Sequence, residues 1–432
     1  MRPEIEHGAG IETREEIEAL VAYEGRGAGT DAERRAAEHL ARRLRAIGRE
    51  GEVEPVVVRP RFALTHALHA LVAVVGSVVS VSSPPVGAAL VLVAAISAYG
   101  DLTGRLFLFR RLTAKRASQN VVSREGGEKA GVLVLLAHHD AAHTGGVFRP
   151  GSVERRARIG ARIRRPFGLA EVFFLALILL LGCCLVRLFL PESALLGVAQ
   201  LVPTAALIGS IPLLLDIVFG RVVPGANDNA SGVATVLALA ELYGDRLEHF
   251  DLWCVLPGSE EAQALGMREW VSRHRGELDR SRTLFVDLDK VGAGTVHYAR
   301  KQGLVFPLTY DARLLGLCEE IAREQPTGEG GRAHAPGLRV RRADDRRRRR
   351  RPRARPVSIS CLNNSDEQAR ELNAPAKSGA VSRVDRPGQR PPARRGPAAH
   401  GPRHRRRSLQ TATPRLLRTR EAPGEGPPRS RE

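Results

Sequence analysis

The 432-residue chain has few cysteines, and none of them forms a recognisable framework. The five are scattered along the sequence, at Cys183, Cys184, Cys254, Cys318 and Cys361. An odd and scattered set excludes a disulfide scaffold and a CxxC zinc site, so we expect free thiols. The first ten residues, MRPEIEHGAG, also lack the charged and then apolar pattern of a secretory signal, and we expect no such signal.

Excess positive charge is confined to the C-terminal part of the chain. Residues 332–432 contain 28 Lys and Arg against 9 Asp and Glu, which accounts for the whole formal charge of +19. Six consecutive arginines and a Pro-, Ala- and Gly-rich composition predict a disordered tail without a packed core.

Two interpretations of this tail stay open. One is an arm that binds nucleic acid or anionic lipid. The other, which we favour, is a stretch translated out of frame from a GC-rich gene, in which PVSISCLNN stands out as an isolated strand-like segment. Residues 1–331 carry balanced charge, so we do not expect a nucleic-acid partner for them.

Four long apolar stretches interrupt the chain, at residues 62–82, 86–100, 167–190 and 195–215. A helix that crosses a bilayer needs about 20 apolar residues. We interpret the stretches as two transmembrane hairpins; the alternative is four buried core helices of a soluble protein. Basic residues lie in the segment between the hairpins and not in their turns, which predicts an integral membrane protein with its polar parts in the cytoplasm.

The remaining segments alternate strands with helices, which indicates an α/β sandwich with functional groups at the strand ends. The expected organisation has N-terminal helices and a first strand, a transmembrane hairpin, a polar and arginine-rich segment, another hairpin, an α/β core and the tail. These parts correspond to residues 1–60, 61–104, 105–166, 167–220, 221–331 and 332–432.

Four short segments place metal-ligand side chains at strand ends or at a helix start. They are AHHD (137–140), GANDNASG (225–232), GSEE (258–261) and DLDKVG (287–292). Each has an ordinary explanation by itself, as a core histidine, a helix cap or first-turn acids. Together they offer imidazole and carboxylate ligands with a free carboxylate as base, a combination that suits zinc-activated water.

These four segments, in this order and after GRGAGTDAERRAAEHLARRL, resemble the co-catalytic zinc aminopeptidases of peptidase family M28 over residues 11–60 and 127–310. The resemblance implies a three-layer α/β/α sandwich with a mixed central sheet, interrupted here by about four transmembrane helices. It also implies two zinc ions and a peptide substrate, whereas contact with membrane lipid is expected from the apolar stretches. The implied function is a membrane-anchored metallopeptidase of aminopeptidase type that hydrolyses peptide bonds.

By position, the resemblance implies the metal ligands His138, Asp228, Glu261 and Asp289 and the catalytic residues Glu260 and Asp140. Asp228 matches the ligand that bridges the two zinc ions, and its peptide bond to Asn229 is often cis in such proteins. Glu260 resembles the general base, and Asp140 resembles the carboxylate that orients the imidazole ligand.

One ligand of the second zinc is missing from this pattern. The family requires a late histidine in a segment such as Tyr-His-x-x-x-Asp-Thr, and His334, His400 and His404 do not match it. We therefore expect a complete first zinc site and a second site that is short of a ligand. The alternative function is a catalytically incomplete membrane protein with a peptidase fold.

Overall fold

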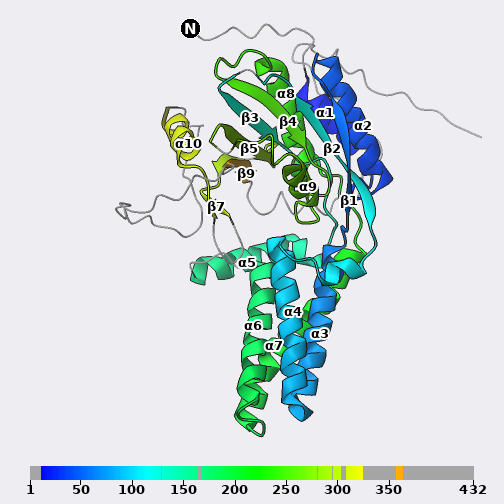
Figure 1. The fold of residues 1–432 in the computed structure, drawn as a ribbon, viewed down its shortest axis with the longest axis vertical. Coiled ribbons are helices and arrows are strands. Elements are labelled where there is room, and N and C mark those ends of the chain that lie inside the picture. Colours follow the sequence, from blue (N-terminus) through cyan, green and yellow to red (C-terminus); the bar gives the residue numbers. More distant parts are fainter. Residues whose placement is uncertain are drawn as a thin grey trace, which may run out of the picture. The chain divides into compact units, whose positions relative to one another are not determined.

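The computed structural model describes residues 11–127, 129–163, 168–279, 281–293, 295–302, 308–324 and 357–362 (Figure 1). The N-terminal decapeptide and most of the arginine-rich tail, including the three late histidines considered above, lie outside these residues. The chain divides into two units, residues 1–378 and 379–432, and every described residue belongs to the first.

A seven-stranded mixed sheet forms the centre of the α/β part, with strand order β1-β2-β4-β3-β5-β9-β6 (Figure 1). The pairs β3–β4, β3–β5 and β5–β9 are parallel, and the other pairs are antiparallel. The strands are β1 (Glu52–Val58), β2 (Arg116–Arg124), β3 (Gly131–Leu136), β4 (Phe250–Leu256), β5 (Thr283–Asp289), β6 (Thr295–Tyr298) and β9 (Val357–Leu362). A separate small ladder joins β7 (Lys301–Gln302) to β8 (Leu308–Thr309).

Helices pack on both faces of this sheet because its strands bury apolar side chains on both sides. Val121 and Val122 show this, since successive strand residues point to opposite faces and the two valines belong to different apolar cores. The core with Val121 includes residues of α1, α2 and α8, whereas the core with Val122 includes Trp270 of α9. The helices of this part are α1 (Thr13–Val21), α2 (Asp31–Ala46), α8 (Ser231–Tyr243), α9 (Leu265–Arg273) and α10 (Ala312–Glu324). The expected α/β/α sandwich with a mixed sheet is confirmed.

Two strands go beyond what the sequence pattern indicated. β2 lies in a segment that we had interpreted only as polar and arginine-rich, because its buried positions include Ser118 and Asn120. These polar side chains are buried because distant partners satisfy them: Ser118 Oγ donates to Glu33, and Asn120 Nδ2 donates to the carbonyl of Gly266. β9 contains most of the strand-like tail segment, and it pairs with β5 and β6 instead of standing alone.

Four helices are long and apolar enough to cross a membrane, namely α3 (Phe62–Ser82), α4 (Pro84–Thr103), α6 (Leu169–Arg187) and α7 (Ala194–Val218). They share one apolar core, in which Ala73 and Ala94 are fully buried. Small side chains of this kind let membrane helices approach closely. Val78 and Leu195 are 66% and 81% exposed, so the bundle also presents apolar side chains outward.

Polar groups inside this bundle are paired with one another. Arg187, which interrupts the third apolar stretch, donates to Gln200 Oε1 at 3.1 Å. Gln200 Nε2 in turn donates to the carbonyl oxygen of Ser77 at 2.8 Å and to Ser80 Oγ at 3.0 Å. The connecting segments contain α5 (Pro150–Ile163) and the short turns η1 (Phe109–Leu112), η2 (Gly146–Phe148) and η3 (Ala226–Ala230). The described cysteines are free, as expected: Cys183, Cys184, Cys254 and Cys318.

Candidate metal centre

The segments that the sequence singled out meet at one edge of the sheet. His138 follows β3 and Asp289 ends β5, and these parallel neighbours end at the same edge. One ligand-type atom from each of His138, Asp228 and Asp289 lies within 4.8 Å of the others, and the same holds for His138, Glu260 and Glu261. The fold therefore brings together an imidazole and four carboxylates from four distant segments.

His138 lies at the centre of this cluster. Its Nε2 is 3.3 Å from Asp228 Oδ1, 3.7 Å from Asp289 Oδ1 and 3.8 Å from Glu260 Oε2. Its Nδ1 faces the carbonyl oxygen of Asp140 at 3.1 Å, which directs Nε2 toward the carboxylates. Burial by itself lowers the pKa of His138, but the surrounding carboxylates, Glu260 first among them, raise it well above its ordinary value.

Asp140 connects the imidazole to the loop that carries the two glutamates. Its carboxylate accepts the backbone N–H of Glu260 at 2.9 Å and that of Glu261 at 3.1 Å. Its Oδ1 also lies 3.4 Å from His138 Nδ1. Burial opposes ionisation of Asp140, yet these donors hold its pKa below the ordinary value. A charged Asp140 can thus fix the imidazole and both glutamates at once.

The two glutamates do not lie in a helix, although the pattern of EEAQALGMREWVSRH (260–274) predicts one from the first glutamate onward. Helix α9 begins only at Leu265, and three of the six residues before it have positive φ, including Ser259 at 51°. Non-glycine residues rarely adopt this conformation. Tertiary contacts stabilise it here, because the Ser259 N–H donates to Glu33 and Arg110 donates to the carbonyl of Ala262.

Two amides flank Asp228 and join its loop to the end of β5. The side chain of Asn229 donates to the carbonyl of Leu288 at 2.8 Å and accepts the N–H of Lys290 at 3.2 Å. Asn227 Oδ1 accepts the N–H of Gly292 at 2.9 Å. These bonds explain the pattern of a carboxylate between two asparagines, because they hold the loop before α8 against the strand end that carries the second aspartate.

Two buried carboxylate oxygens in the cluster, Asp228 Oδ1 and Asp289 Oδ1, have no hydrogen-bond partner. Leaving such an acceptor unsatisfied is costly in a folded protein. Both oxygens face His138 Nε2, and one imidazole nitrogen with carboxylate oxygens is a donor set that suits Zn²⁺. The residues present therefore fit a zinc ion. The Asp228–Asn229 peptide bond is cis, as the resemblance implies.

Lys290 occupies the other side of the same two aspartates. Its Nζ lies 3.0 Å from Asp228 Oδ2 and 2.9 Å from Asp289 Oδ2. Burial lowers the pKa of Lys290, but the two carboxylates raise it above its ordinary value, so the side chain is an ammonium. The sequence reasoning gave Lys290 no role, although a cation directly after a proposed ligand was a visible signal.

Two residues from the N-terminal segment contact the segments that carry the cluster, and the sequence analysis gave neither of them a role. Arg26 is buried and donates to the carbonyl oxygens of His139 at 3.0 Å and Gly225 at 2.7 Å, so it joins two of the site segments. Burial lowers its pKa to about 10. Glu33 accepts the N–H of Ser259 at 2.8 Å and thereby supports the glutamate loop. Their pairing depends on residues more than 100 positions away, which no local pattern encodes.

The described part of the chain holds no second imidazole at this cluster. Both groups of ligand-type side chains found there use His138. His139 donates through Nδ1 to the carbonyl of Leu256, and His143 donates to that of Gly220, so both serve the surrounding structure.

A family model described as Peptidase family M28 matches residues 215–322. No curated protein matches the chain. Among solved structures, a Zn-dependent exopeptidase from Parabacteroides distasonis is 12% identical with a TM-score of 0.39, over 84% of this chain and 80% of that one. A glutaminyl cyclase from Tannerella forsythia is 15% identical with a TM-score of 0.38, over 83% and 79% of the two chains. An aminopeptidase from an Aneurinibacillus species is 13% identical with a TM-score of 0.34, over 66% and 72%.

The family match includes three of the four segments that form the cluster, those with Asp228, with Glu260 and Glu261, and with Asp289. The resemblance to peptidase family M28 that the sequence indicated is thereby confirmed, with a family-model match over residues 215–322.

Proposed function

We propose that this protein is a membrane-anchored, zinc-dependent hydrolase of aminopeptidase type that cleaves peptide bonds. The observation that carries the proposal is the pair of unsatisfied aspartate oxygens facing His138, which calls for a cation at that point. We assign zinc binding to His138, Asp228 and Asp289. A zinc ion held there would polarise the carbonyl group of the substrate and would lower the pKa of a bound water molecule from about 16 towards 7.

Glu260 is the group that we assign to proton transfer. Its side chain is 42% exposed, and its Oε2 is 3.8 Å from His138 Nε2, so it lies beside the metal position and is open to solvent. Although the side chain is partly exposed, the surrounding protein desolvates its carboxylate, and this effect and the like charges of Asp140 and Asp289 raise its pKa above the ordinary value. A raised pKa favours a carboxylate that can both accept and return a proton. Asp140 acts as a positioning residue through its bonds to the glutamate loop.

We further propose that the ammonium of Lys290 supplies the positive charge that a second metal ion would otherwise bring. It pairs with the outer oxygens of both aspartates, and Glu261 is among the charges that raise its pKa. Glu261 is the ligand that the resemblance implies for a second zinc. This arrangement supports one zinc per chain, because the ammonium already balances the carboxylates of Asp228 and Asp289 that a second metal ion would share. Burial and the charge of Asp228 raise the pKa of Glu261 well above the ordinary value.

A catalytically incomplete metal-binding protein is the second candidate. The same Lys290 contacts favour it, since an ammonium competes with a metal ion for the carboxylates of Asp228 and Asp289. One zinc per chain together with peptide turnover supports the hydrolase, whereas bound zinc with no turnover supports the second candidate.

We assign α3, α4, α6 and α7 to the membrane and the α/β part to its cytoplasmic side. Their length and composition support the first assignment, and the basic residues of the connecting segment 105–166 support the second. We retain the six-part organisation, with residues 357–362 of the tail segment forming β9 of the sheet.

The test uses the full-length protein in detergent with aminoacyl p-nitroanilides, and zinc is counted by inductively coupled plasma mass spectrometry. We expect Glu260→Gln to lower kcat about 10²–10⁴-fold while zinc content is unchanged. Glu248→Gln removes a carboxylate whose side chain is 86% exposed, and it serves as the matched control with unchanged turnover. Equal turnover of the two variants would refute the role of Glu260.

A further inference from the structure

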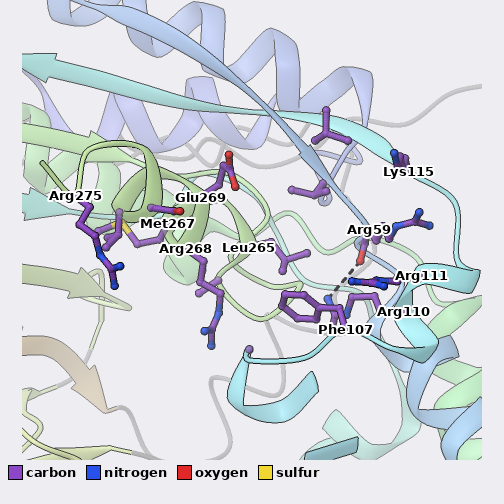
Figure 2. A pocket seen from close by; sticks show the side chains of 16 residues that line it. Arg59, Phe107, Arg110, Arg111, Lys115, Leu265, Met267, Arg268, Glu269 and Arg275 are labelled. Carbon is purple, nitrogen blue, oxygen red and sulfur yellow. Dashed lines mark hydrogen bonds between the residues drawn. The ribbon is translucent and has the colours of Figure 1, made fainter. Parts of the chain in front are cut away.

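A basic hollow of about 770 Å³ lies next to the ends of two candidate membrane helices. Its lining includes one acidic side chain, Glu269, and six cationic ones: Arg59, Arg110, Arg111, Lys115, Arg268 and Arg275. These cations come from three parts of the chain, which are the segment after β1, the segment from η1 to β2, and α9 with the residues after it (Figure 2). The fold thus collects positive charge that is dispersed in the sequence.

Three of these cations have protein partners. Arg110 is buried and pairs with both oxygens of Asp101 at 2.7 and 2.8 Å. Arg59 donates to the carbonyl of Thr113, and Arg268 donates to a backbone carbonyl at 3.0 Å. Burial and the charge of Arg110 lower the pKa of Arg268, as expected where cations are crowded.

The other three are exposed and face no hydrogen-bond or ion-pair partner within the described part of the chain: Arg111, Lys115 and Arg275. Cations that line one hollow without acidic partners create a positive potential inside it. That potential favours an anionic ligand.

The position of the hollow indicates what kind of anion reaches it. Arg59 lies just before α3, which begins at Phe62, and Gly104 and Phe107 follow directly after α4. The hollow therefore borders the point where two candidate spans join the polar part of the chain. Three leucines in the same connection are exposed at 39%, 40% and 74%: Leu106, Leu108 and Leu112. Exposed apolar side chains beside cations are typical of the layer between lipid headgroups and acyl chains.

We propose that this hollow binds the phosphate group of an anionic phospholipid. Guanidinium groups match phosphate oxygens with two parallel hydrogen bonds, and a lysine adds a mobile point charge. In this arrangement Arg111 and Lys115 contact the phosphate, and Arg275, on the opposite side of the hollow, adds to the positive potential (Figure 2), while the acyl chains lie against the exposed leucines. A soluble phosphate compound shares the oxyanion chemistry but has no apolar part to cover the leucines, so the observations favour the lipid.

The test compares two triple variants of the full-length protein in dodecyl maltoside. The pocket variant carries Arg111→Gln, Lys115→Gln and Arg275→Gln. The control variant removes the same charge at exposed positions outside the hollow, by Arg42→Gln, Arg246→Gln and Arg313→Gln. Dioleoyl phosphatidylglycerol and dioleoyl phosphatidylcholine are titrated separately, and native mass spectrometry measures the bound lipid.

We expect wild type and control to prefer phosphatidylglycerol. Each basic residue near an anionic lipid surface contributes roughly a factor of five, so the pocket variant should bind on the order of 100-fold more weakly. Melting temperatures of all variants verify folding. The single substitutions, each expected to weaken binding about fivefold, serve if the triple variant is unstable.

Equal affinity of the pocket and control variants for phosphatidylglycerol would overturn the proposed site. Equal binding of phosphatidylcholine by the wild type would overturn it as well, because the net negative charge that distinguishes an anionic phospholipid from this zwitterionic one would then not be recognised. Inorganic phosphate and glycerol phosphate are added as competitors. Displacement of the lipid by either one at a comparable concentration would show that the oxyanion alone is recognised, and would refute the lipid assignment.

Discussion

Replacement of Lys290 by methionine tests the charge balance of the candidate metal centre. The variant keeps an unbranched side chain and removes the ammonium that lies 3.0 Å from Asp228 Oδ2 and 2.9 Å from Asp289 Oδ2. At about 3 Å and an effective dielectric constant near 20, each pair is worth roughly 5 kcal/mol before the cost of burial is counted. The three side chains are 20–27% exposed, so solvent screening reduces this value.

Loss of one partner from a buried ion pair typically costs about 3–5 kcal/mol. Allowing for the partial exposure, we expect metal-free Lys290→Met to lose about 3 kcal/mol of unfolding free energy, the lower end of that range. We expect zinc to bind on the order of 100-fold more tightly, because about 3 kcal/mol of repulsion toward the metal is removed. The zinc content should rise from one toward two per chain.

The assay measures urea unfolding with EDTA and with zinc, together with zinc content by mass spectrometry. Lys129→Met is the matched control, because its ammonium makes an exposed contact with the carbonyl of Asp245 at 3.4 Å. Unchanged zinc affinity and stoichiometry in Lys290→Met, relative to this control, would refute the idea that Lys290 stands in for a cation.

Three further predictions concern the support of the site. Burial raises the pKa of Glu33 to about 8, above its unfolded value of 4.5, so the stability that its protonated form contributes is present at low pH and is lost as pH rises through 8. The free energy of unfolding in urea should therefore differ less between pH 6 and pH 9 in Glu33→Gln than in the wild type. Arg26→Met removes the side-chain donor to four backbone carbonyl oxygens, of which those of Leu20 and Gly225 keep a backbone donor, and the denaturation midpoint should reflect a loss of about 3 kcal/mol. Gly232→Ala would place a Cβ 2.2 Å from the carbonyl oxygen of Leu288 and should cost about 1–3 kcal/mol in thermal unfolding, whereas Gly276→Ala, with nothing within 4 Å, should be nearly neutral.

Local patterns in the sequence determined much of this protein. Continuous apolar runs predict the four long helices because a helix that faces lipid must be apolar over its whole length. Alternation of strands and helices predicts the α/β class, and ligand-type residues at strand ends predict a site at one edge of the sheet, since parallel strands end there together. Such features depend only on residues close together in the chain.

Only the tertiary structure decided the features that depend on distant partners. Strand β2 is buried in spite of its polar residues, because Ser118 donates to Glu33 and Asn120 donates to the carbonyl of Gly266. The loop with Glu260 and Glu261 is not helical because two distant residues stabilise another conformation. Arg110, 152 residues away in the sequence, donates to the carbonyl of Ala262, and Glu33 accepts the N–H of Ser259. The basic hollow and the orientation of the ammonium beside the two aspartates likewise require the folded chain. Hydrogen bonds and charge interactions act over a few ångströms in space, and sequence spacing alone does not show which of these groups meet.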